Sequence, residues 1–361
     1  MKPLELFFDA RFIRVGQHDG ISRFSVGLFE ALAKRVKLTA IVSDLKQLDK
    51  LPSATSYLLV NEPTSVKELW LARKLNRAGA KFVFSTMQTM GSFGKRYKLI
   101  LTLHDLIYYR HPAPPPSLSA PIRLLWRLFH LSYWPERFLL NRADSVVAVS
   151  ATTKRLMISH NLTKRPIAVI YNAAGAFDES MPKPKSRPVG ASKLLYMGSF
   201  MSYKNVETLI LGLNHLPEHE LHLLSKIDAK RRTQLEALIP RGAKVVFHDG
   251  VSEEAYRNLL KTSVALVSAS LDEGFGIPLI EAMSLGIPVV VSDIEIFREI
   301  GGDAAVYFEA TSPQAFAQAV SRLNSNPDWM TFSKLASQNA KRFSWSESAT
   351  ELLKVIEELS T

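Results

Sequence analysis

The chain has 361 residues, a length that suits two domains better than a single core. It contains no cysteine, which excludes disulfides, thiolate metal sites and a cysteine nucleophile. The net charge of +11 is uneven: residues 1–176 hold 26 Lys+Arg against 11 Asp+Glu, whereas residues 177–361 hold 19 against 23, so we expect an anionic partner for the first half.

Short apolar runs alternate with helical patterns throughout the first half. The predicted strands lie at residues 4–8, 38–42, 57–60, 82–84, 99–103, 146–149 and 168–170. This alternation predicts a parallel sheet with helices on both faces. Ligands of such sheets bind beyond the carboxyl ends of the strands.

The first predicted strand leads into a polar loop that contains Gly20. Ser22 is a good N-cap, and the apolar residues after it have helical spacing, so we expect a helix to begin there. The loop lacks the Gly-x-Gly-x-x-Gly fingerprint, which argues against a nicotinamide site. His104 follows the predicted strand at 99–103 and so stands at the edge where ligands bind, although a lone histidine in such a place is more often only hydrogen-bonded.

Residues 121–138 predict a basic, aromatic, amphipathic helix. Arg123 and Arg127 recur at helical spacing, Trp126 flanks an apolar stripe, and Pro135 is expected to break or kink the helix. A helix of this kind can lie on an anionic membrane surface, and the alternative is a helix packed on its own domain with a solvated basic face. We favour membrane contact because the whole half is basic.

The second half restarts the alternation after a stretch at 178–192 that is rich in Pro, Lys and Ser and predicts a hinge. The predicted strands lie at residues 194–197, 221–224, 245–247, 264–268 and 289–291. Gly198 follows the first of these strands, and Lys204 stands just before a predicted helix. A glycine turn with a lysine at a helix start is a phosphate-binding arrangement.

The most informative stretch is 270–281, Ser-Leu-Asp-Glu-Gly-Phe-Gly-Ile-Pro-Leu-Ile-Glu. A buried strand leads into Glu273, two glycines follow, and Pro278 suits the first turn of a helix that carries Glu281. Backbone N–H groups at that helix start favour an anion, and the glycines let a ligand approach the main chain. The two carboxylates are far enough apart to hold two different parts of one elongated ligand.

This glutamate, seven residues, glutamate pattern resembles the signature of the family-4 glycosyltransferases, which are retaining enzymes of the GT-B fold with two Rossmann-like domains. His104 in its strand-end context and the Gly198–Lys204 loop are similar to further elements of that family, and the first loop is similar to that of its mannosyltransferase-like members. The resemblance implies an acceptor-side domain at 1–177, the hinge at 178–192, a donor domain at 193–342, and a closing helix at 343–361 that crosses back to the first domain.

The resemblance also implies roles for individual residues. It assigns catalysis to Glu273, His104 and Lys204, and donor binding to Gly20, Gly198, Lys204, Ser225, Val251, Glu273, Gly274, Phe275, Gly276, Ile277 and Glu281. The acceptor or membrane side would hold Arg123, Trp126 and Arg127. Ser199 and Tyr203 stand where many members add an arginine, which leaves open what supplies the second cation for the diphosphate.

We therefore expect a retaining, metal-independent glycosyltransferase with no cofactor. Its donor would be a nucleoside-diphosphate hexose, with GDP-mannose favoured and UDP-glucose or a deoxysugar nucleotide still open. Its acceptor would be a glycan, a glycolipid or a lipid-linked sugar of a cell envelope, and nucleic acid is not expected as a partner. The alternatives are a nucleotide-sugar epimerase on the same fold and a non-catalytic protein that binds anionic surfaces.

The sequence also bears on location. The first residues lack the charged and apolar regions of a signal peptide, and no run of about 18 uncharged apolar residues occurs. We expect a cytoplasmic protein, with peripheral attachment to the inner face of the membrane as the added possibility that the basic helix raises.

Overall fold

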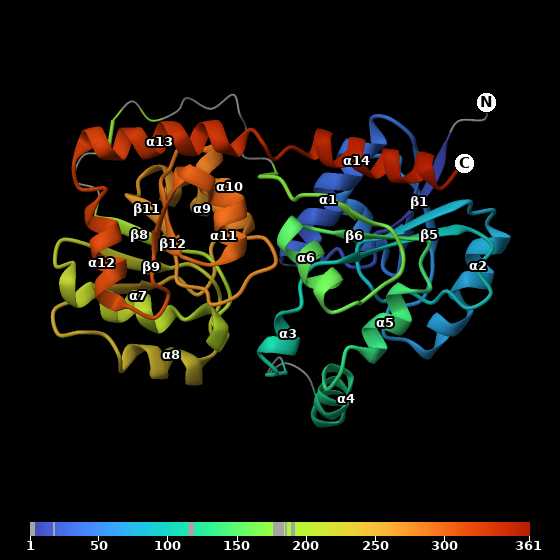
Figure 1. Ribbon diagram of the computed structural model, residues 1–361, viewed down its shortest axis with the longest axis horizontal. Helices are drawn as coiled ribbons and strands as arrows, with labels where there is room; N and C mark the ends of the chain where they lie inside the picture. Colours follow the sequence, from blue (N-terminus) through green and yellow to red (C-terminus); the bar gives the residue numbers. More distant parts are fainter. Residues whose placement is uncertain (1–3, 17–18, 115–118, 176–183, 185, 189–191) are drawn as a thin grey trace. The chain divides into compact units, whose positions relative to one another are not determined.

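A computed structural model describes residues 4–16, 19–114, 119–175, 184, 186–188 and 192–361 (Figure 1). The chain divides into two compact units. Unit 1 comprises Met1–Ala173 with Ser344–Thr361, and unit 2 comprises Ala174–Phe343. Most of the hinge predicted at 178–192 lies outside the described residues.

Unit 1 is built on a seven-stranded parallel sheet with the order β3-β2-β1-β4-β5-β6-β7. The strands are β1 (Glu5–Asp9), β2 (Lys37–Val42), β3 (Ser56–Leu59), β4 (Phe82–Ser85), β5 (Lys98–Leu103), β6 (Ser145–Ala148) and β7 (Ile167–Val169). In the register, Phe8 of β1 lies opposite Ala40 of β2 and Phe84 of β4. The central strands read as continuous apolar runs because helices cover both faces of the sheet.

The helices of unit 1 include one from the end of the chain. They are α1 (Gly20–Ala33), α2 (Leu71–Arg77), α3 (Ile107–Arg110), α4 (Ala120–His130), α5 (Trp134–Leu140), α6 (Ala151–Ser159) and α14 (Trp345–Glu358), with 3-10 turns η1 (Leu45–Lys50) and η2 (Val66–Trp70). Helix α14 packs along α1 (Figure 1): the ring of Trp345 lies 6.0 Å from that of Phe24, and a Cβ at Gly27 would come within 2.2 Å of the Trp345 ring. Glycine at position 27 therefore makes room for the closing helix.

Unit 2 is built on a six-stranded parallel sheet with the order β10-β9-β8-β11-β12-β13. The strands are β8 (Lys193–Tyr196), β9 (Glu220–Leu223), β10 (Lys244–Phe247), β11 (Ala265–Ser268), β12 (Val289–Ser292) and β13 (Ala305–Phe308). The helices are α7 (Val206–Gly212), α8 (Ala229–Glu236), α9 (Glu253–Lys261), α10 (Ile277–Ser284), α11 (Glu295–Gly301), α12 (Pro313–Ser321) and α13 (Asn326–Ala340), with η3 (Ser202–Lys204), η4 (Leu213–His215) and η5 (Gly302–Ala304). Every residue of β11 and β12 is buried, as the middle of a two-sided sheet requires.

Comparison with the predicted elements gives agreement and two corrections. Each predicted strand is present, and its ends lie within one or two residues of the predicted ones. The helix predicted at 121–138 is interrupted before Pro135, which occupies the first turn of α5. Strand β13 was missed. The prediction that Ser22 caps the first helix was wrong: Asp19 is the N-cap and accepts from the Ser22 backbone N–H at 2.8 Å, while the buried Ser22 hydroxyl accepts from the Arg14 backbone N–H at 2.9 Å.

Candidate active site

The sheet order of unit 2 brings most of the predicted donor residues to one edge. Strands β10, β9, β8 and β11 are consecutive neighbours and run parallel, so the loops after their carboxyl ends form one row. Along that row stand Val251, Ser225, Gly198 and Glu273. This is the place where parallel α/β sheets bind ligands.

The loop after β8 is shaped by Gly198. Its backbone N–H donates to the Ser225 hydroxyl at 3.2 Å, which joins the loops after β8 and β9. An added Cβ at Gly198 would come within 2.7 Å of the hydroxyl oxygen of Tyr196, a buried side chain that itself donates to the Ser199 carbonyl at 2.5 Å. Only glycine fits here without moving the Tyr196 ring.

Lys204 and Glu273 come together at the centre of the row. The Lys204 Nζ lies 2.5 Å from the Glu273 Oε1, and both side chains are 14% exposed. The Ser270 hydroxyl donates to the same carboxylate oxygen at 2.9 Å. Two loops whose residues are 69 positions apart thus hold one ammonium and one carboxylate side by side, where the charge of each can act on a bound ligand.

Further contacts fix the position of this pair. The Leu271 backbone N–H donates to the Tyr203 carbonyl at 2.7 Å and ties the two loops together. Asn205, next to Lys204, adopts a left-handed backbone with φ 49°, and its side-chain amide donates to the Ala310 carbonyl at 2.7 Å. Asparagine tolerates this conformation better than most residues, so the turn at the start of α7 is held in one shape.

The start of α10 follows the predicted pattern of strand, loop and helix. Gly276 precedes the helix with φ +95°, a backbone conformation that residues with a side chain rarely adopt. Pro278 lies in the first turn of the helix. Gly274 is partly exposed, whereas Phe275 and Ile277 are buried, with the Phe275 ring 5.7 Å from that of Phe343. Those two side chains face the interior, so any contact with a donor would use their backbone N–H groups.

Glu281 lies one turn into α10 and is 2% exposed. It is therefore a buried acid on the helix whose N-terminus faces the sheet edge, whereas Glu273 is on the partly exposed loop before it. The two carboxylates therefore lie in different environments, one buried and one partly exposed.

The structure adds a residue that the sequence pattern did not indicate. Arg231 of α8 donates through Nε to the Phe200 carbonyl at 2.9 Å and through a terminal nitrogen to Glu207 at 2.6 Å. It thereby brings a guanidinium against the Gly198–Lys204 loop. Its distance along the sequence, about 30 residues beyond the loop, left no local signal.

In unit 1, His104 and Gly20 lie at the same end of the domain. The His104 ring lies edge-on to Phe24 of α1, with centroids 5.3 Å apart, and its Nε2 is 2.8 Å from the Thr86 carbonyl oxygen. Gly20 is the exposed first residue of α1. Burial lowers the pKa of His104 below its ordinary 6.5, opposed by the Thr86 hydrogen bond, so the ring is neutral at pH 7.

Helix α4 turns one side toward its own domain. The Trp126 ring packs against Tyr108 at 5.1 Å and against His130 at 4.1 Å. Arg123 and Arg127 are exposed, and neither has an ion-pair partner among the described residues. Of the three predicted residues, the arginines remain available on the surface, whereas Trp126 helps to dock the helix.

With this geometry established, comparison with known proteins identifies the chain. The profile described as Glycosyltransferase Family 4 matches residues 18–174, and that described as Glycosyl transferases group 1 matches residues 177–343. The chain belongs to the family-4 glycosyltransferases. This glycosyltransferase is 26% identical to the O-antigen chain mannosyltransferase RfbU of Salmonella typhimurium over 320 residues, which cover 86% of this chain and 88% of RfbU.

Solved structures show the same GT-B fold. Sucrose-phosphate synthase from Thermosynechococcus elongatus superimposes with a TM-score of 0.76 at 17% identity, covering 98% of each chain. HepE from Anabaena, solved in complex with UDP-glucose, superimposes with a TM-score of 0.72 at 17% identity, covering 98% of this chain and 99% of HepE. The two parallel sheets described above are therefore the two Rossmann-like domains of a GT-B enzyme.

Two further observations apply to the described part of the chain. It contains no group of three or more His, Cys, Asp or Glu side chains arranged to hold a metal ion. None of its helices has both the length and the apolar character needed to cross a bilayer.

Proposed function

We propose that this glycosyltransferase transfers mannose, with retention of anomeric configuration and without a metal ion, from a nucleoside-diphosphate donor to a glycan or lipid-linked acceptor. The pairing of Lys204 with Glu273 beside the Gly198 loop carries the proposal. It puts a cation, a carboxylate and a helix N-terminus within one short row of loops. A nucleotide sugar has matching parts: a diphosphate for the cation and the backbone N–H groups, and hydroxyls for the carboxylate.

In the proposed reaction the bond between the sugar C1 and the diphosphate oxygen breaks first, through an oxocarbenium-like state. The acceptor hydroxyl oxygen then bonds to C1 on the face that the diphosphate leaves, and its proton passes to the departing phosphate oxygen. Lys204 and the N–H groups at the start of α10 stabilise the charge that develops on the diphosphate. Glu273 positions the sugar hydroxyls, Glu281 holds the ribose, and the neutral His104 lines the acceptor side.

The role of Lys204 is tested by kinetics with GDP-mannose. Lys204→Ala should lower kcat by about 100-fold or more, the usual cost of removing one charge-stabilising donor, and should weaken nucleotide binding. Lys230→Ala, which removes an exposed ammonium from α8 in the same unit, is the matched control and should behave as the wild type. Full turnover by Lys204→Ala would refute the assignment.

Stereochemistry and metal dependence need separate measurements. NMR of the product should show the anomeric configuration of the donor, and an inverted linkage would contradict the mechanism. Turnover should survive an excess of EDTA, because Lys204 and the α10 N-terminus supply the positive charge that a metal would otherwise provide. Loss of activity with EDTA that is restored by Mg²⁺ or Mn²⁺ would overturn metal independence.

GDP-mannose is the proposed donor because the mannosyltransferase RfbU matches this chain over 88% of its own length. The competing donor is UDP-glucose, with which HepE was solved. A thermal-shift comparison of GDP, UDP, dTDP and ADP at one concentration separates the two, because the ligand that binds the folded state more tightly stabilises it more. We expect the largest rise with GDP, and a larger rise with UDP would replace mannose as the favoured sugar.

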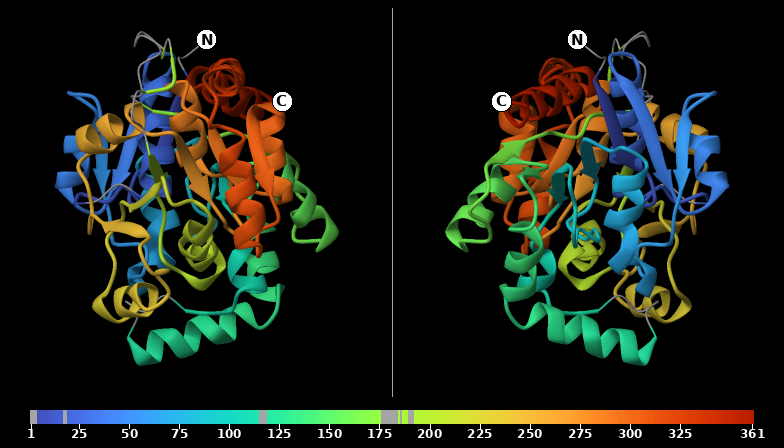
Figure 2. Two further views of the ribbon diagram at one scale, coloured as in Figure 1. Left: turned by 90° about the vertical axis from the view of Figure 1, so that its left-hand side faces the viewer. Right: turned by 90° about the vertical axis from the view of Figure 1, so that its right-hand side faces the viewer.

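We also propose that α4 attaches the protein to the cytoplasmic face of an anionic membrane. Four leucines in and just after α4 are exposed. They are Leu124 (59% exposed), Leu125 (65%), Leu128 (53%) and, just past the helix end, Leu131 (77%). Figure 2 shows α4 at the periphery of its domain, reached through α3 and α5. An apolar face that points away from the domain, bordered by two unpaired arginines, matches the helices that lie in the interface of anionic membranes.

Flotation with vesicles tests this attachment. The wild type should float with anionic vesicles and not with neutral ones, and Leu125→Gln/Leu128→Gln should abolish the binding. Leu45→Gln/Ile158→Gln changes two side chains of similar exposure elsewhere in unit 1 and should leave it unchanged. Equal, negligible flotation with both vesicle types would remove the proposal.

A further inference from the structure

Unit 1 contains a cavity that is separate from the loops described above. Its volume is about 820 Å³, within the range of ligand sites, and it lies between the end of β3 and the helical segment formed by η2 and α2. The aromatic and charged side chains that line it are Trp70, Lys67, Arg73, Lys74, Arg77 and Glu62. We refer to this as the β3–α2 cavity.

The charge of the β3–α2 cavity is strongly positive. Four cationic side chains line it against the single carboxylate of Glu62. Lys74 donates to the Leu59 carbonyl at 2.6 Å, whereas Lys67, Arg73 and Arg77 have no side-chain partner among the described residues. Two arginines that are not already paired are well suited to the oxygens of a phosphate or carboxylate, which guanidinium groups bind through two parallel hydrogen bonds.

Trp70 gives the cavity an apolar wall. The ring is 52% exposed, although the neighbouring Leu71, Ala72 and Leu75 on the other side of the segment are buried in the core. A tryptophan that is left out of an adjacent core offers a flat surface to a partner. The C–H face of a sugar ring fits such a surface, and a sugar that carries an anionic group would satisfy the tryptophan and the arginines together.

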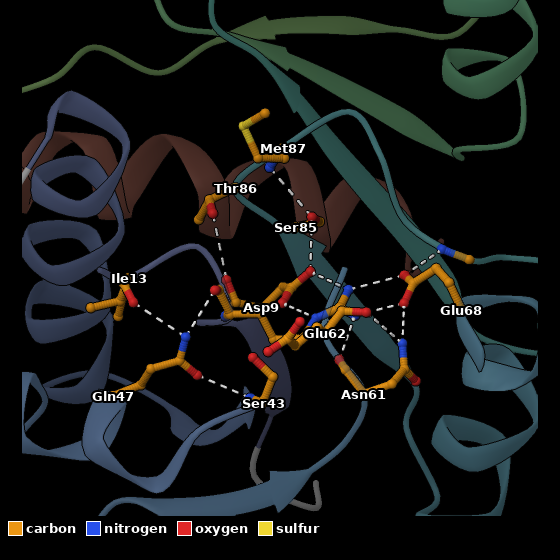
Figure 3. A network of polar contacts seen from close by, with 12 residues as sticks. Asp9, Ile13, Ser43, Gln47, Asn61, Glu62, Glu68, Ser85, Thr86 and Met87 are labelled. Atoms are coloured by element: carbon orange, nitrogen blue, oxygen red, sulfur yellow. Dashed lines mark hydrogen bonds and ion pairs between the residues drawn. The ribbon is translucent and has the colours of Figure 1, made fainter. Parts of the chain in front are cut away.

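The segment that carries these side chains is anchored by a network of hydrogen bonds and ion pairs (Figure 3). Glu68 of η2 accepts from Arg11 at 2.7 and 3.1 Å, from the Asn61 amide at 2.6 Å and from the Gly91 backbone N–H at 2.9 Å. Arg11 in turn pairs with the buried Asp9 at the end of β1. The cavity is therefore preorganised by contacts to the ends of β1 and β3.

The position of the cavity relates it to the acceptor. It lies beyond the carboxyl end of β3, on the same sheet edge as His104 at the end of β5. Four strand spacings separate β3 from β5, which corresponds to about 19 Å. A monosaccharide cannot span that distance, whereas a chain of several sugars can.

We propose that the β3–α2 cavity is a remote subsite that binds an anionic sugar of the acceptor chain, stacked on Trp70 and paired with Arg73 and Arg77. The proposal rests on the proposed transfer to a glycan acceptor. It adds a class of acceptor: an oligosaccharide with a phosphate or carboxylate several residues from the hydroxyl that reacts.

Binding is tested without reference to activity, by NMR of the full-length protein with ¹⁵N-labelled tryptophan. Trp70→Phe assigns the Trp70 indole signal among the five tryptophans. Mannose 6-phosphate should move that signal in a saturable way, whereas methyl mannoside and inorganic phosphate alone should move it much less. An unmoved Trp70 signal, or an equal effect of inorganic phosphate, would overturn the proposal.

Matched variants separate the subsite from general electrostatics. Arg73→Ala/Arg77→Ala should weaken mannose 6-phosphate binding about 10-fold or more, as expected for the loss of charge-assisted hydrogen bonds. Lys34→Ala/Lys164→Ala, which removes two exposed cations elsewhere in unit 1, should not. Equal weakening in both pairs would show that only net charge matters, and loss of anionic-vesicle binding in the arginine pair would assign the cavity to lipid.

The test also distinguishes this subsite from the proposed donor chemistry. Lys204→Ala should keep the Trp70 response, because Lys204 belongs to unit 2. The arginine pair should keep donor binding and transfer to a monosaccharide acceptor, with a raised KM only for long anionic acceptors. A lost Trp70 response with intact sugar transfer refutes the subsite alone, whereas an intact response without any transfer refutes the proposed function alone.

Discussion

Replacing Glu136 should change how the stability of unit 1 depends on pH. This residue of α5 is 1% exposed, and burial raises the pKa of its carboxyl from an ordinary 4.5 to about 7. Tyr109 and Gln88 oppose the rise, and the nearby carboxylate of Asp105 adds to it. At a pH between these two pKa values, the Glu136 carboxyl holds a proton in the folded state that it has lost in the unfolded state.

Proton linkage gives the sign and size of the change in stability. Because the folded state binds the extra proton, the contribution of Glu136 to stability is complete below the unfolded pKa of 4.5 and is lost as the pH rises through about 7. A rise of the pKa from 4.5 to about 7 corresponds to about 3 kcal/mol in the free energy of unfolding. Glu136→Gln keeps the shape and removes the titration, so it should become more stable relative to the wild type by about this amount between about pH 5 and about pH 8.

Urea unfolding of the full-length proteins over that pH range measures the difference. Hydrogen exchange in α5 assigns the transition to unit 1, because a chain with two compact units need not unfold in a single step. Glu30→Gln, at an exposed position of α1, is the control and should run parallel to the wild type. If the Glu136→Gln curve also runs parallel to the wild type, the carboxyl is not held protonated by burial.

Two further predictions concern the loop after β8. Gly198→Ala should raise the KM for the donor and lower the melting temperature, because its Cβ would collide with the Tyr196 hydroxyl; Gly16→Ala, with open space around it, should do neither. Arg231→Ala should release the loop and raise the donor KM more than it lowers kcat, whereas Arg232→Ala, whose partner is an exposed glutamate on the same helix, should leave both unchanged. Steady-state kinetics and calorimetric unfolding test both predictions. An unchanged donor KM in Gly198→Ala would refute the first, and identical kinetics of the two arginine variants would refute the second.

Local patterns in the sequence were sufficient for the architecture and the central motif. The strands were recognisable because β-branched and aromatic runs favour extended, buried backbone, and glycine and proline mark turns and helix starts within a few residues. The loop before α10 was readable for that reason: Gly276 has the positive φ that glycine permits, and Pro278 lies in the first turn. Strand β13 (Ala305–Phe308) carries the same kind of apolar and aromatic run and was nevertheless not predicted.

Contacts between distant parts of the chain could not be read in this way. The sequence placed Lys204 and Glu273 in separate phosphate and sugar roles, and only the sheet order, with β8 next to β11, brings them to 2.5 Å. The same holds for Arg231, which reaches the loop from a helix after the next strand. Nothing in residue spacing encodes which strands are neighbours.

The direction in which a side chain points was likewise decided by tertiary packing. Trp126 was expected on the membrane or acceptor side, and its ring packs on Tyr108 of α3, while four leucines of this segment are exposed. The sequence by itself determined that this chain would form parallel α/β domains with the strand, loop and helix motif of a glycosyltransferase, because those features depend on neighbours within a turn or a strand. The tertiary structure alone decided which charges meet and which faces stay open, because these depend on the order and packing of elements far apart along the chain.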